Sequence, residues 1–342
     1  MVAAVAEPDS VTTVGLGRPS VFAWAADFDG CSYYRAALPA RILREHGHNT
    51  DAYPELPLDG GDWDVIIGQR TVREDTSAMW QRLAADGRRL VFEVDDDLWH
   101  IPPHNPAHAF FDRACLDRAA ENASAAAAVT VSTEPLAAVL RQFNPRVHVM
   151  PNYIDEALLH LQRPRRPWVT VGWAGSPTHR EDLRVCGRPV KKLLAARGNV
   201  DLHVIGWDYR NAFGGHGRFT PWARPTPNYY RLIDFDIGIA PLADDEFNAS
   251  KSPVKALEYA ALGIPVVASN TGPYPGFVKH GVTGFLADTE QDWARYLRML
   301  TADRGLRERM GDAAREQAAD WTIQRHAAEW SRLVTDIAEE SV

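Results

Sequence analysis

Two lysines and a glutamate recur at helical spacing in the C-terminal part of the chain. Lys251, Lys255 and Glu258 stand at positions i, i+4 and i+7, which places them on one face of a predicted helix. Lys251 and Ser252 are expected at or near the helix start, where free N–H groups and the helix dipole attract anions. Pro253 suits the first turn. Two cations there suit a diphosphate, and a carboxylate two turns on suits a pair of sugar hydroxyls. The pattern predicts recognition of a sugar nucleotide, although an amphipathic helix with solvated lysines would show the same spacing.

The stretch from Phe247 to Ser269 resembles the donor-binding motif of GT-B-fold glycosyltransferases, most closely glycosyltransferase family 4 and its relatives. In those enzymes the second glutamate of a pair, eight residues apart, holds the nucleotide ribose. Glu258 matches this second glutamate, and segment 263–269 matches the strand that follows it. Ser250 stands where the first glutamate would be, so the usual contact to the donor sugar is missing from the pattern.

The resemblance implies a retaining glycosyltransferase of the hexosyltransferase type that needs no metal and no cofactor. Its partners would be a nucleoside diphosphate sugar, with a UDP-sugar favoured on family frequency, and a small-molecule or glycan acceptor. Lys251 and Lys255 would stabilise the charge that develops on the leaving diphosphate. Three alternatives stay open: a sugar-nucleotide epimerase of the same fold, a hydrolase of the donor, and an inactive relative that only binds the nucleotide sugar.

Length, charge and cysteine content narrow the class of protein. A chain of 342 residues suits one large or two medium α/β domains. The net charge of −8 argues against a nucleic-acid partner and against attraction to an anionic membrane surface. The three cysteines are far apart and are expected to be reduced thiols of a cytoplasmic protein. Residues 1–18 are expected to be a disordered tail rather than a signal peptide, and no apolar run is long enough for a transmembrane helix.

Strands and helices are expected to alternate along the first half, which indicates βαβ units and a mostly parallel sheet. The helices are expected over residues 34–46 and 74–85. The strands are expected over residues 21–26, 63–67, 89–94, 128–132 and 146–150.

A proline-rich, charged linker at 163–167 separates this series from a second one. A long helical region is expected from about residue 291 to 319, and segment 321–340 is placed to cross back onto the first half. The strands of the second series are expected over residues 168–173, 202–205, 237–240 and 264–268.

The fold class is therefore expected to be α/β, with two Rossmann-like domains of mostly parallel sheets facing a central cleft, as in GT-B. Residues 1–160 would form the acceptor domain, residues 161–320 the donor domain, and residues 321–342 the returning helix. Because ligands of open α/β sheets lie beyond the carboxyl ends of the strands, the active site is expected in the cleft.

The loop that follows the first strand of the second half is expected to bind the donor. Gly175 and Ser176 can bring backbone N–H groups close to a diphosphate, although a plain turn between strand and helix would also use a glycine. His179 would contact the donor or cap the helix. Gly272 and Tyr274, after the last strand, are expected on the sugar side.

The loop that follows the first strand of the first half is expected to face the donor from across the cleft. Gly30 permits a tight turn there and is assigned to donor binding. Ser32 and Tyr33 supply hydroxyls for the acceptor, and Arg35 would brace the leaving diphosphate. A purely structural arginine is the alternative.

Three consecutive aspartates at 95–97 repel one another unless a cationic or hydroxylic group is near. Asp96 and Asp97 are expected to hold sugar hydroxyls or to assist proton removal from the acceptor, with Trp99 and His100 on the acceptor side. A metal-binding Asp-x-Asp motif and a solvated acidic turn are the alternatives. A zinc site from His100, His104 and His108 is not expected, because the prolines between them prevent a shared helical face.

Overall fold

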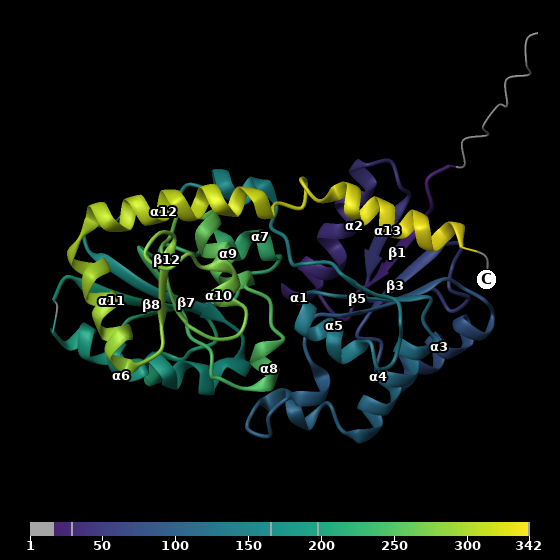
Figure 1. The fold of residues 1–342 in the computed structure, drawn as a ribbon, viewed down its shortest axis with the longest axis horizontal. Helices are drawn as coiled ribbons and strands as arrows, with labels where there is room; N and C mark the ends of the chain where they lie inside the picture. Colours follow the sequence, from purple (N-terminus) through teal and green to yellow (C-terminus); the bar gives the residue numbers. More distant parts are fainter. Residues whose placement is uncertain (1–16, 29, 165, 197, 341–342) are drawn as a thin grey trace, which may run out of the picture.

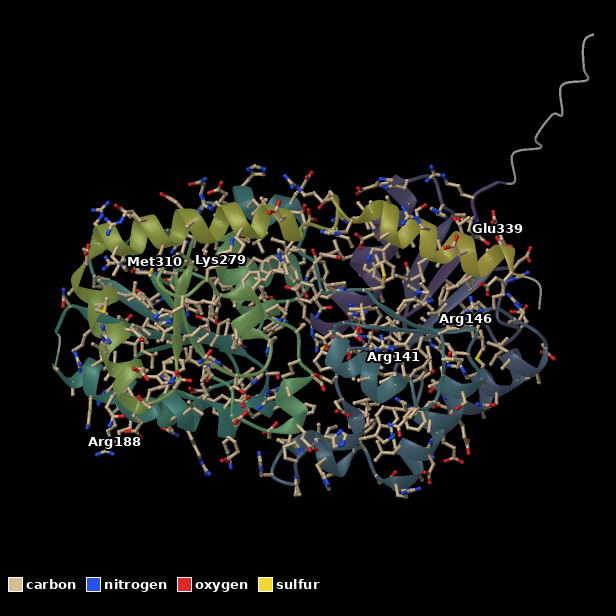
Figure 2. All side chains as sticks on the ribbon, viewed as in Figure 1. Arg141, Arg146, Arg188, Lys279, Met310 and Glu339 are labelled. Atoms are coloured by element: carbon tan, nitrogen blue, oxygen red, sulfur yellow. The ribbon has the colours of Figure 1, made fainter. Side chains whose placement is uncertain are left out.

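The chain forms two halves that lie side by side, each built on a six-stranded parallel sheet (Figure 1). The coordinates are a computed structural model that describes residues 17–340 with the exception of 29, 165 and 197. Most of the tail that was expected to be disordered, residues 1–16, lies outside the described residues. Side chains pack throughout both halves (Figure 2).

The N-terminal sheet has the strand order β2-β1-β3-β4-β5-β6. Its central strands are continuous apolar runs, as expected for parallel strands covered by helices on both faces. The strands are β1 (Val21–Trp24), β2 (Thr50–Tyr53), β3 (Val65–Gln69), β4 (Leu90–Val94), β5 (Ala128–Val131) and β6 (Val147–Val149). The helices are α1 (Gly30–Ser32), α2 (Leu38–Glu45), α3 (Glu74–Ala85), α4 (Arg113–Ala125) and α5 (Glu134–Leu140).

The C-terminal sheet has the strand order β12-β11-β10-β7-β8-β9. Its strands are β7 (Val169–Gly175), β8 (Val200–Gly206), β9 (Arg218–Pro221), β10 (Ile237–Ala240), β11 (Val266–Ser269) and β12 (Gly284–Ala287). Its helices are α6 (Arg180–Ala196), α7 (Thr226–Tyr230), α8 (Glu246–Ala249), α9 (Val254–Ala261), α10 (Tyr274–Phe277), α11 (Glu290–Ala302) and α12 (Arg304–Ala318).

The chain passes between the halves twice, and the two passages lie beside each other. Ile154 donates to the carbonyl of Trp321 at 3.0 Å, and Ile323 donates back to the carbonyl of Ile154 at 2.8 Å. After the second passage, α13 (Ala327–Glu339) packs against α2 and β3 of the N-terminal half (Figure 1). Leu158 already belongs to the core of the C-terminal half, so the first passage lies at residue 154, a few residues before the expected boundary at 160.

Three strands of the structure lie outside the sequence-based expectation. They are β2, β9 and β12, which are all four residues long and lie at sheet edges. Each of them is short, so the apolar run that could mark it in the sequence is brief. The helical region expected over 291–319 is two helices, because Asp303 ends α11 and its side chain accepts a hydrogen bond from the N–H of Leu306 at the start of α12.

The expected helix over 34–46 also begins differently. Residues 33–37 form one turn of π-helix, closed by the N–H of Leu38 donating to the carbonyl of Tyr33. Pro39 explains the wide turn, because it has no N–H to donate to the carbonyl of Arg35 and its ring crowds that carbonyl. The widened turn carries Tyr34 and Arg35, both of which are buried.

The side chain of Arg35 is buried in the N-terminal half, which corrects the expectation that it braces a leaving group across the cleft. Its Nε lies 2.7 Å from Oε1 of Glu93, and both side chains are fully buried. The same guanidinium donates to the carbonyl of Met150 and to Asn152. Burial raises the pKa of Glu93 to about 7, although Arg35 opposes this shift. A buried carboxylate on β4 requires a cation, and this requirement holds Arg35 away from the cleft.

We expect Arg35→Met to lower the free energy of unfolding by about 3–5 kcal/mol at pH 8, because it leaves a buried carboxylate without its partner. The loss should be smaller at pH 6, where Glu93 can take up a proton. Urea denaturation of the wild type, Arg35→Met and Arg35→Met/Glu93→Gln at both pH values measures the effect. A loss that stays equally dependent on pH in the double variant would contradict the assignment.

Candidate active site

A cavity of about 860 Å³ lies between the two halves, beyond the carboxyl ends of the strands. The N-terminal half lines it mainly with loops that follow β1, β3 and β4. The C-terminal half lines it with the loop that follows β7, the end of β8 and the first turns of α9. Ten residues predicted for the site line this cavity: Gly30, Asp96, Gly175, Ser176, His179, Lys251, Ser252, Lys255, Glu258 and Tyr274.

Lys255 lies closest to the loop after β7. Its Nζ donates to the carbonyl of Ala174 at 2.6 Å and lies 5.0 Å from the centre of the Trp173 ring. A Cβ atom on Gly175 would come within 2.9 Å of this Nζ and within 2.6 Å of the Trp173 ring, so the loop needs a glycine there. Lys255 and Gly175 thus place a cation and the backbone of this loop at the same wall of the cavity.

Lys251 does not belong to α9, contrary to the expectation of a three-residue stripe. Ser252 precedes a proline, a position that disfavours helical geometry, and α9 begins only at Val254. Lys251 therefore lies in the turn after α8, with Nζ 4.5 Å from the centre of the Phe247 ring and 4.0 Å from Oδ2 of Asp182. The turn still brings its charge to the cavity wall beside Lys255.

The carboxylate of Glu258 is held by hydroxyls from both halves. Tyr34 of the N-terminal half donates to Oε1, and Tyr229 of the C-terminal half donates to Oε2 at 3.0 Å. Glu258 is 6% exposed, and burial raises its pKa. Each carboxylate oxygen keeps a further lone pair, so two ribose hydroxyls can still be accepted.

Asp182 is a site residue that sequence reasoning missed. It accepts hydrogen bonds from Nδ1 of His179 at 2.7 Å, from the N–H of Ala243 at 2.9 Å and from Asn248 at 2.9 Å. Burial alone would raise the pKa of Asp182, but the bonds and the nearby charge of Lys251 lower it to about 2. Its only sequence signal is the spacing of three residues from His179 on the first turn of a helix.

His179 is neutral in this site. Burial lowers its pKa to about 3, and the charges of Lys255 and Lys251 act in the same direction. Because ionised Asp182 can only accept a hydrogen bond, Nδ1 of His179 carries the proton and Nε2 is an acceptor. This tautomer suits contact with a sugar hydroxyl better than contact with a phosphate oxygen.

The three carboxylates at residues 95–97 lie in two different environments. Asp95 and Asp96 line the cavity, whereas Asp97 is 1% exposed and does not. Asp97 accepts from the N–H of Trp99 at 3.1 Å and from Nδ1 of His100 at 2.7 Å, so it caps the short helical turn over 98–100. Both of its oxygens are used, and its expected catalytic role is not supported by its position.

The other predicted residues outside the cavity lining also have structural partners. Ser32 bonds to Asp27 at 2.8 Å and to Gln69 at 2.7 Å, which braces the loop after β1. Tyr33 packs edge-on against Tyr34 and Tyr230. Burial of Ser32 corrects the expectation that it reaches an acceptor, whereas Tyr33 is half-buried and does not line the cavity.

Structural roles outside the cavity lining are also found for Trp99, His100 and Gly272. The ring of Trp99 stacks on Phe143, with 4.9 Å between the ring centres. His100 lies 3.5 Å from Glu246 and so joins the two halves beside the cavity. Gly272 has a positive φ of 58°, and a Cβ there would come within 2.7 Å of a backbone oxygen, so this glycine shapes a turn.

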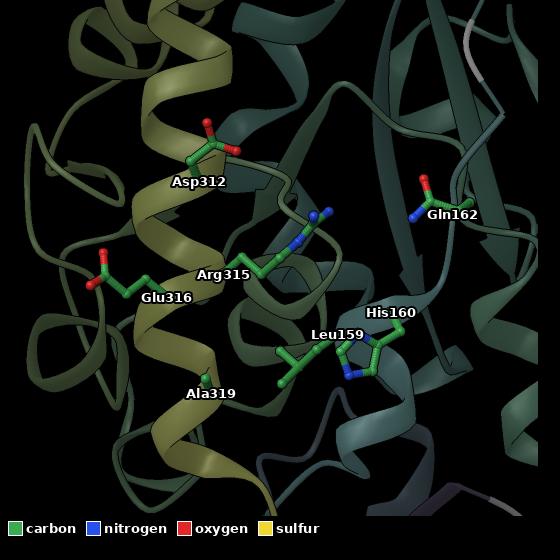
Figure 3. Close-up of a pocket in the computed structure, with 7 residues that line it drawn as sticks. All are labelled: Leu159, His160, Gln162, Asp312, Arg315, Glu316 and Ala319. Atoms are coloured by element: carbon green, nitrogen blue, oxygen red, sulfur yellow. The ribbon is translucent and has the colours of Figure 1, made fainter.

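No group of three or more histidine, cysteine or carboxylate side chains is placed to hold a metal ion within the described part of the chain. No helix among the described residues is both long and apolar enough to span a membrane. A second cavity of about 550 Å³ lies away from the cleft, between segment 159–162 and α12 (Figure 3). It contains none of the predicted site residues.

Comparison with known proteins identifies similar sequences and folds. Residues 250–317 match the model of the family described as glycosyl transferases group 1. A D-inositol 3-phosphate glycosyltransferase from Jonesia denitrificans is 30% identical over 185 residues, which cover 53% of this chain and 36% of the relative. The protein of that name from Corynebacterium jeikeium is 36% identical over 188 residues, which cover 49% and 43% of the two chains. The matches thus span less than half the length of these curated relatives.

Solved structures extend the likeness over nearly the whole chain. Sucrose-phosphate synthase from Thermosynechococcus elongatus superposes with a TM-score of 0.68 at 14% identity and covers 93% of this chain and 99% of the other. Anabaena HepE in complex with UDP-glucose superposes with a TM-score of 0.63 at 16% identity and covers 90% and 98%. The chain has the GT-B fold. The fold class and the resemblance predicted from residues 247–269 are therefore confirmed.

We expect the imidazole of His179 to show the Nδ1–H tautomer and no titration between pH 5 and 8. In Asp182→Asn, the amide can donate to Nδ1, so the proton should move to Nε2. Long-range ¹H–¹⁵N correlation spectra of both proteins measure this, with a His179→Gln variant to assign the signal. An Nε2–H tautomer in the wild type would refute the network around Asp182.

Proposed function

We propose that this chain is a retaining glycosyltransferase that moves a sugar from a nucleoside diphosphate sugar to an acceptor hydroxyl. The observation that carries the proposal is the cavity wall of the C-terminal half. It combines two lysines, a glycine-containing loop that can present backbone N–H groups, and a buried carboxylate with free lone pairs. These are the groups that a diphosphate and a ribose require.

The proposed roles follow the positions along this wall. Lys251, Lys255 and the backbone of Gly175 and Ser176 would bind the diphosphate and stabilise the charge that grows on it as the sugar leaves. Glu258 would accept hydrogen bonds from the ribose hydroxyls, with its carboxylate oriented by two tyrosines. His179 would accept from a hydroxyl of the donor sugar, and Tyr274 would lie beside it.

A UDP-sugar is the donor that we favour. Structures with the same fold include Anabaena HepE in complex with UDP-glucose and a TarM variant in complex with UDP. The chemistry of this wall is also compatible with transfer without a metal, because the lysine ammonium groups supply positive charge at the diphosphate. The cytoplasmic location expected from the cysteine usage remains a prediction.

We expect the affinity for UDP to fall above pH 8. Burial lowers the pKa of Lys255 to about 8; Glu258 partly offsets this, and Lys251 lowers the pKa further. A lysine loses its charge as the pH rises through its pKa, so Kd should be constant below pH 8 and rise by up to about tenfold per pH unit above it. Bound diphosphate would raise the pKa of Lys255 in the complex, and the rise in Kd would end at that higher pKa.

Titration calorimetry between pH 7 and 9.5 measures the effect, and Lys255→Arg is the matched control because its guanidinium stays charged throughout. An identical rise in Kd for Lys255→Arg would assign the effect to another group. Lys255→Ala should also lower turnover by about a hundredfold or more, as the loss of a group that stabilises developing charge does.

The deciding experiment is incubation with UDP-glucose, GDP-mannose and other nucleotide sugars, with and without EDTA, followed by ¹H NMR of the anomeric protons. The proposal expects UDP release that survives EDTA, a product with the anomeric configuration of the donor, and dependence on Lys255. Conversion of the donor into its epimer would identify an epimerase. Release of free sugar that added acceptors leave unchanged would identify a hydrolase. Lack of turnover with intact UDP binding would identify an inactive relative.

A further inference from the structure

The two lysines that the proposed function assigns to the diphosphate are held in different ways. The contacts that fix Lys255 come from the C-terminal half, since its Nζ donates to the carbonyl of Ala174 and lies over the ring of Trp173. Lys251 lies between α8 and α9, so its backbone belongs to neither helix. The position of Lys251 therefore depends on what holds the turn over residues 250–253.

The helix that leads into this turn, α8, is anchored in the N-terminal half. Phe247 on α8 is 5% exposed and belongs to the same apolar cluster as Leu98 and Ile101, whose other described members all come from the N-terminal half. The ring of Phe247 also contacts the ammonium group of Lys251, with 4.5 Å between Nζ and the ring centre. One side chain thus connects the core of the N-terminal half to this lysine.

Two side chains of the N-terminal half donate hydrogen bonds to the turn itself. The hydroxyl of Thr133 donates to the carbonyl of Ser250 at 2.7 Å. The Nδ2 of Asn152 donates to the hydroxyl of Ser252 at 2.8 Å. Because these acceptors belong to the residues directly before and after Lys251, both neighbours of the lysine are held from across the cavity.

The two donors are themselves fixed within the N-terminal half. Asn152 is 6% exposed, and its Oδ1 accepts a hydrogen bond from the buried guanidinium of Arg35 at 3.0 Å. This bond orients the amide so that Nδ2 points toward the turn. The hydroxyl of Thr133 caps α5 by accepting from the N–H of Leu136 at 3.4 Å, so its hydrogen is available for the turn. The N-terminal half therefore presents a preformed surface to the residues around Lys251.

We propose that Thr133 and Asn152 are positioning residues for Lys251, which aligns with the diphosphate only while the two halves are in contact. The inference rests on the proposed function, because it takes the diphosphate as the partner of Lys251. Among the described residues, Thr133 is not part of the cavity lining, so its hydroxyl would act on a ligand through the turn rather than by contact. Lys255 would bind the diphosphate in either arrangement of the halves, and Lys251 would add its charge when they meet.

The first measurement follows the lysines without any ligand. The chain contains five lysines, so ¹H–¹³C spectra of protein labelled at the lysine Cε contain few signals. The rings of Phe247 and Trp173 lie beside the Nζ atoms of Lys251 and Lys255, and their ring currents should displace both Hε signals. Thr133→Val should move the Lys251 signal toward that of an exposed lysine and leave the Lys255 signal in place. Lys251→Arg and Lys255→Arg assign the two signals.

The second measurement is the affinity for UDP, by titration calorimetry at pH 7. Thr133→Val should weaken UDP binding by about fivefold, the effect of losing one hydrogen bond, and should leave binding of uridine, which has no phosphate, unchanged. Thr133→Ser keeps the hydroxyl and should retain the affinity of the wild type. In a Lys251→Met background, Thr133→Val should have no further effect on Kd, because its effect passes through the ammonium group.

Thr289→Val is the matched control, because it removes the same hydroxyl from the N-cap of α11, a helix whose residues do not line the cavity. It should alter neither the Lys251 signal nor the Kd of UDP. Asn152→Ala, read in the same lysine spectra, is a second variant in case Thr133→Val does not fold, and it should also move the Lys251 signal.

Three results would overturn the inference. They are an unchanged Lys251 signal in Thr133→Val or, if that variant does not fold, in Asn152→Ala; a Thr133→Ser protein as weak in UDP binding as Thr133→Val; and an equal effect of Thr133→Val with and without the ammonium group of Lys251. Failure of the wild type to bind UDP would overturn the proposed function. The lysine spectra need no ligand, so they would still decide whether the N-terminal half positions Lys251.

Discussion

The buried carboxylate of Glu258 is the interaction on which the arrangement of this molecule depends. A carboxylate this far from water needs hydrogen-bond donors, and the two hydroxyls that supply them come from opposite halves of the chain. Tyr34 lies in the π-helical turn over 33–37. The buried carboxylate of Glu258 thus joins side chains of both halves.

The charged side chains of the cavity are divided between the two halves. The wall from the C-terminal half holds Lys251 and Lys255 near the start of α9, and burial beside them lowers the pKa of His179. The wall from the N-terminal half holds Asp27, Asp95, Asp96 and Arg70. Under the proposed function, this division of charge would orient an anionic donor toward the wall of the C-terminal half.

The sequence predicted the architecture well because buried parallel strands and their helices leave strong periodic signals. It also predicted ten residues that line the cavity, among them Lys255 and Glu258 of the motif over 247–269 and Gly175 of the loop after β7. It failed at Arg35, which is turned inward by Glu93, 58 positions away, and at Asp97, whose carboxylate caps the short helical turn over 98–100. Asp182 was missed because two of its donors, Ala243 and Asn248, come from a distant part of the chain.

The paired passages at Ile154 and Trp321 also have a mechanical consequence. Because hydrogen bonds tie these two segments together, we expect relative movement of the halves to be a rotation about this region. In a rotation, displacement grows with distance from the axis. The contact between His100 and Glu246, which joins the halves beside the cavity, would therefore part before the hydrogen bonds at Ile154 are disturbed. The halves could then separate at this contact while the two passages stay joined.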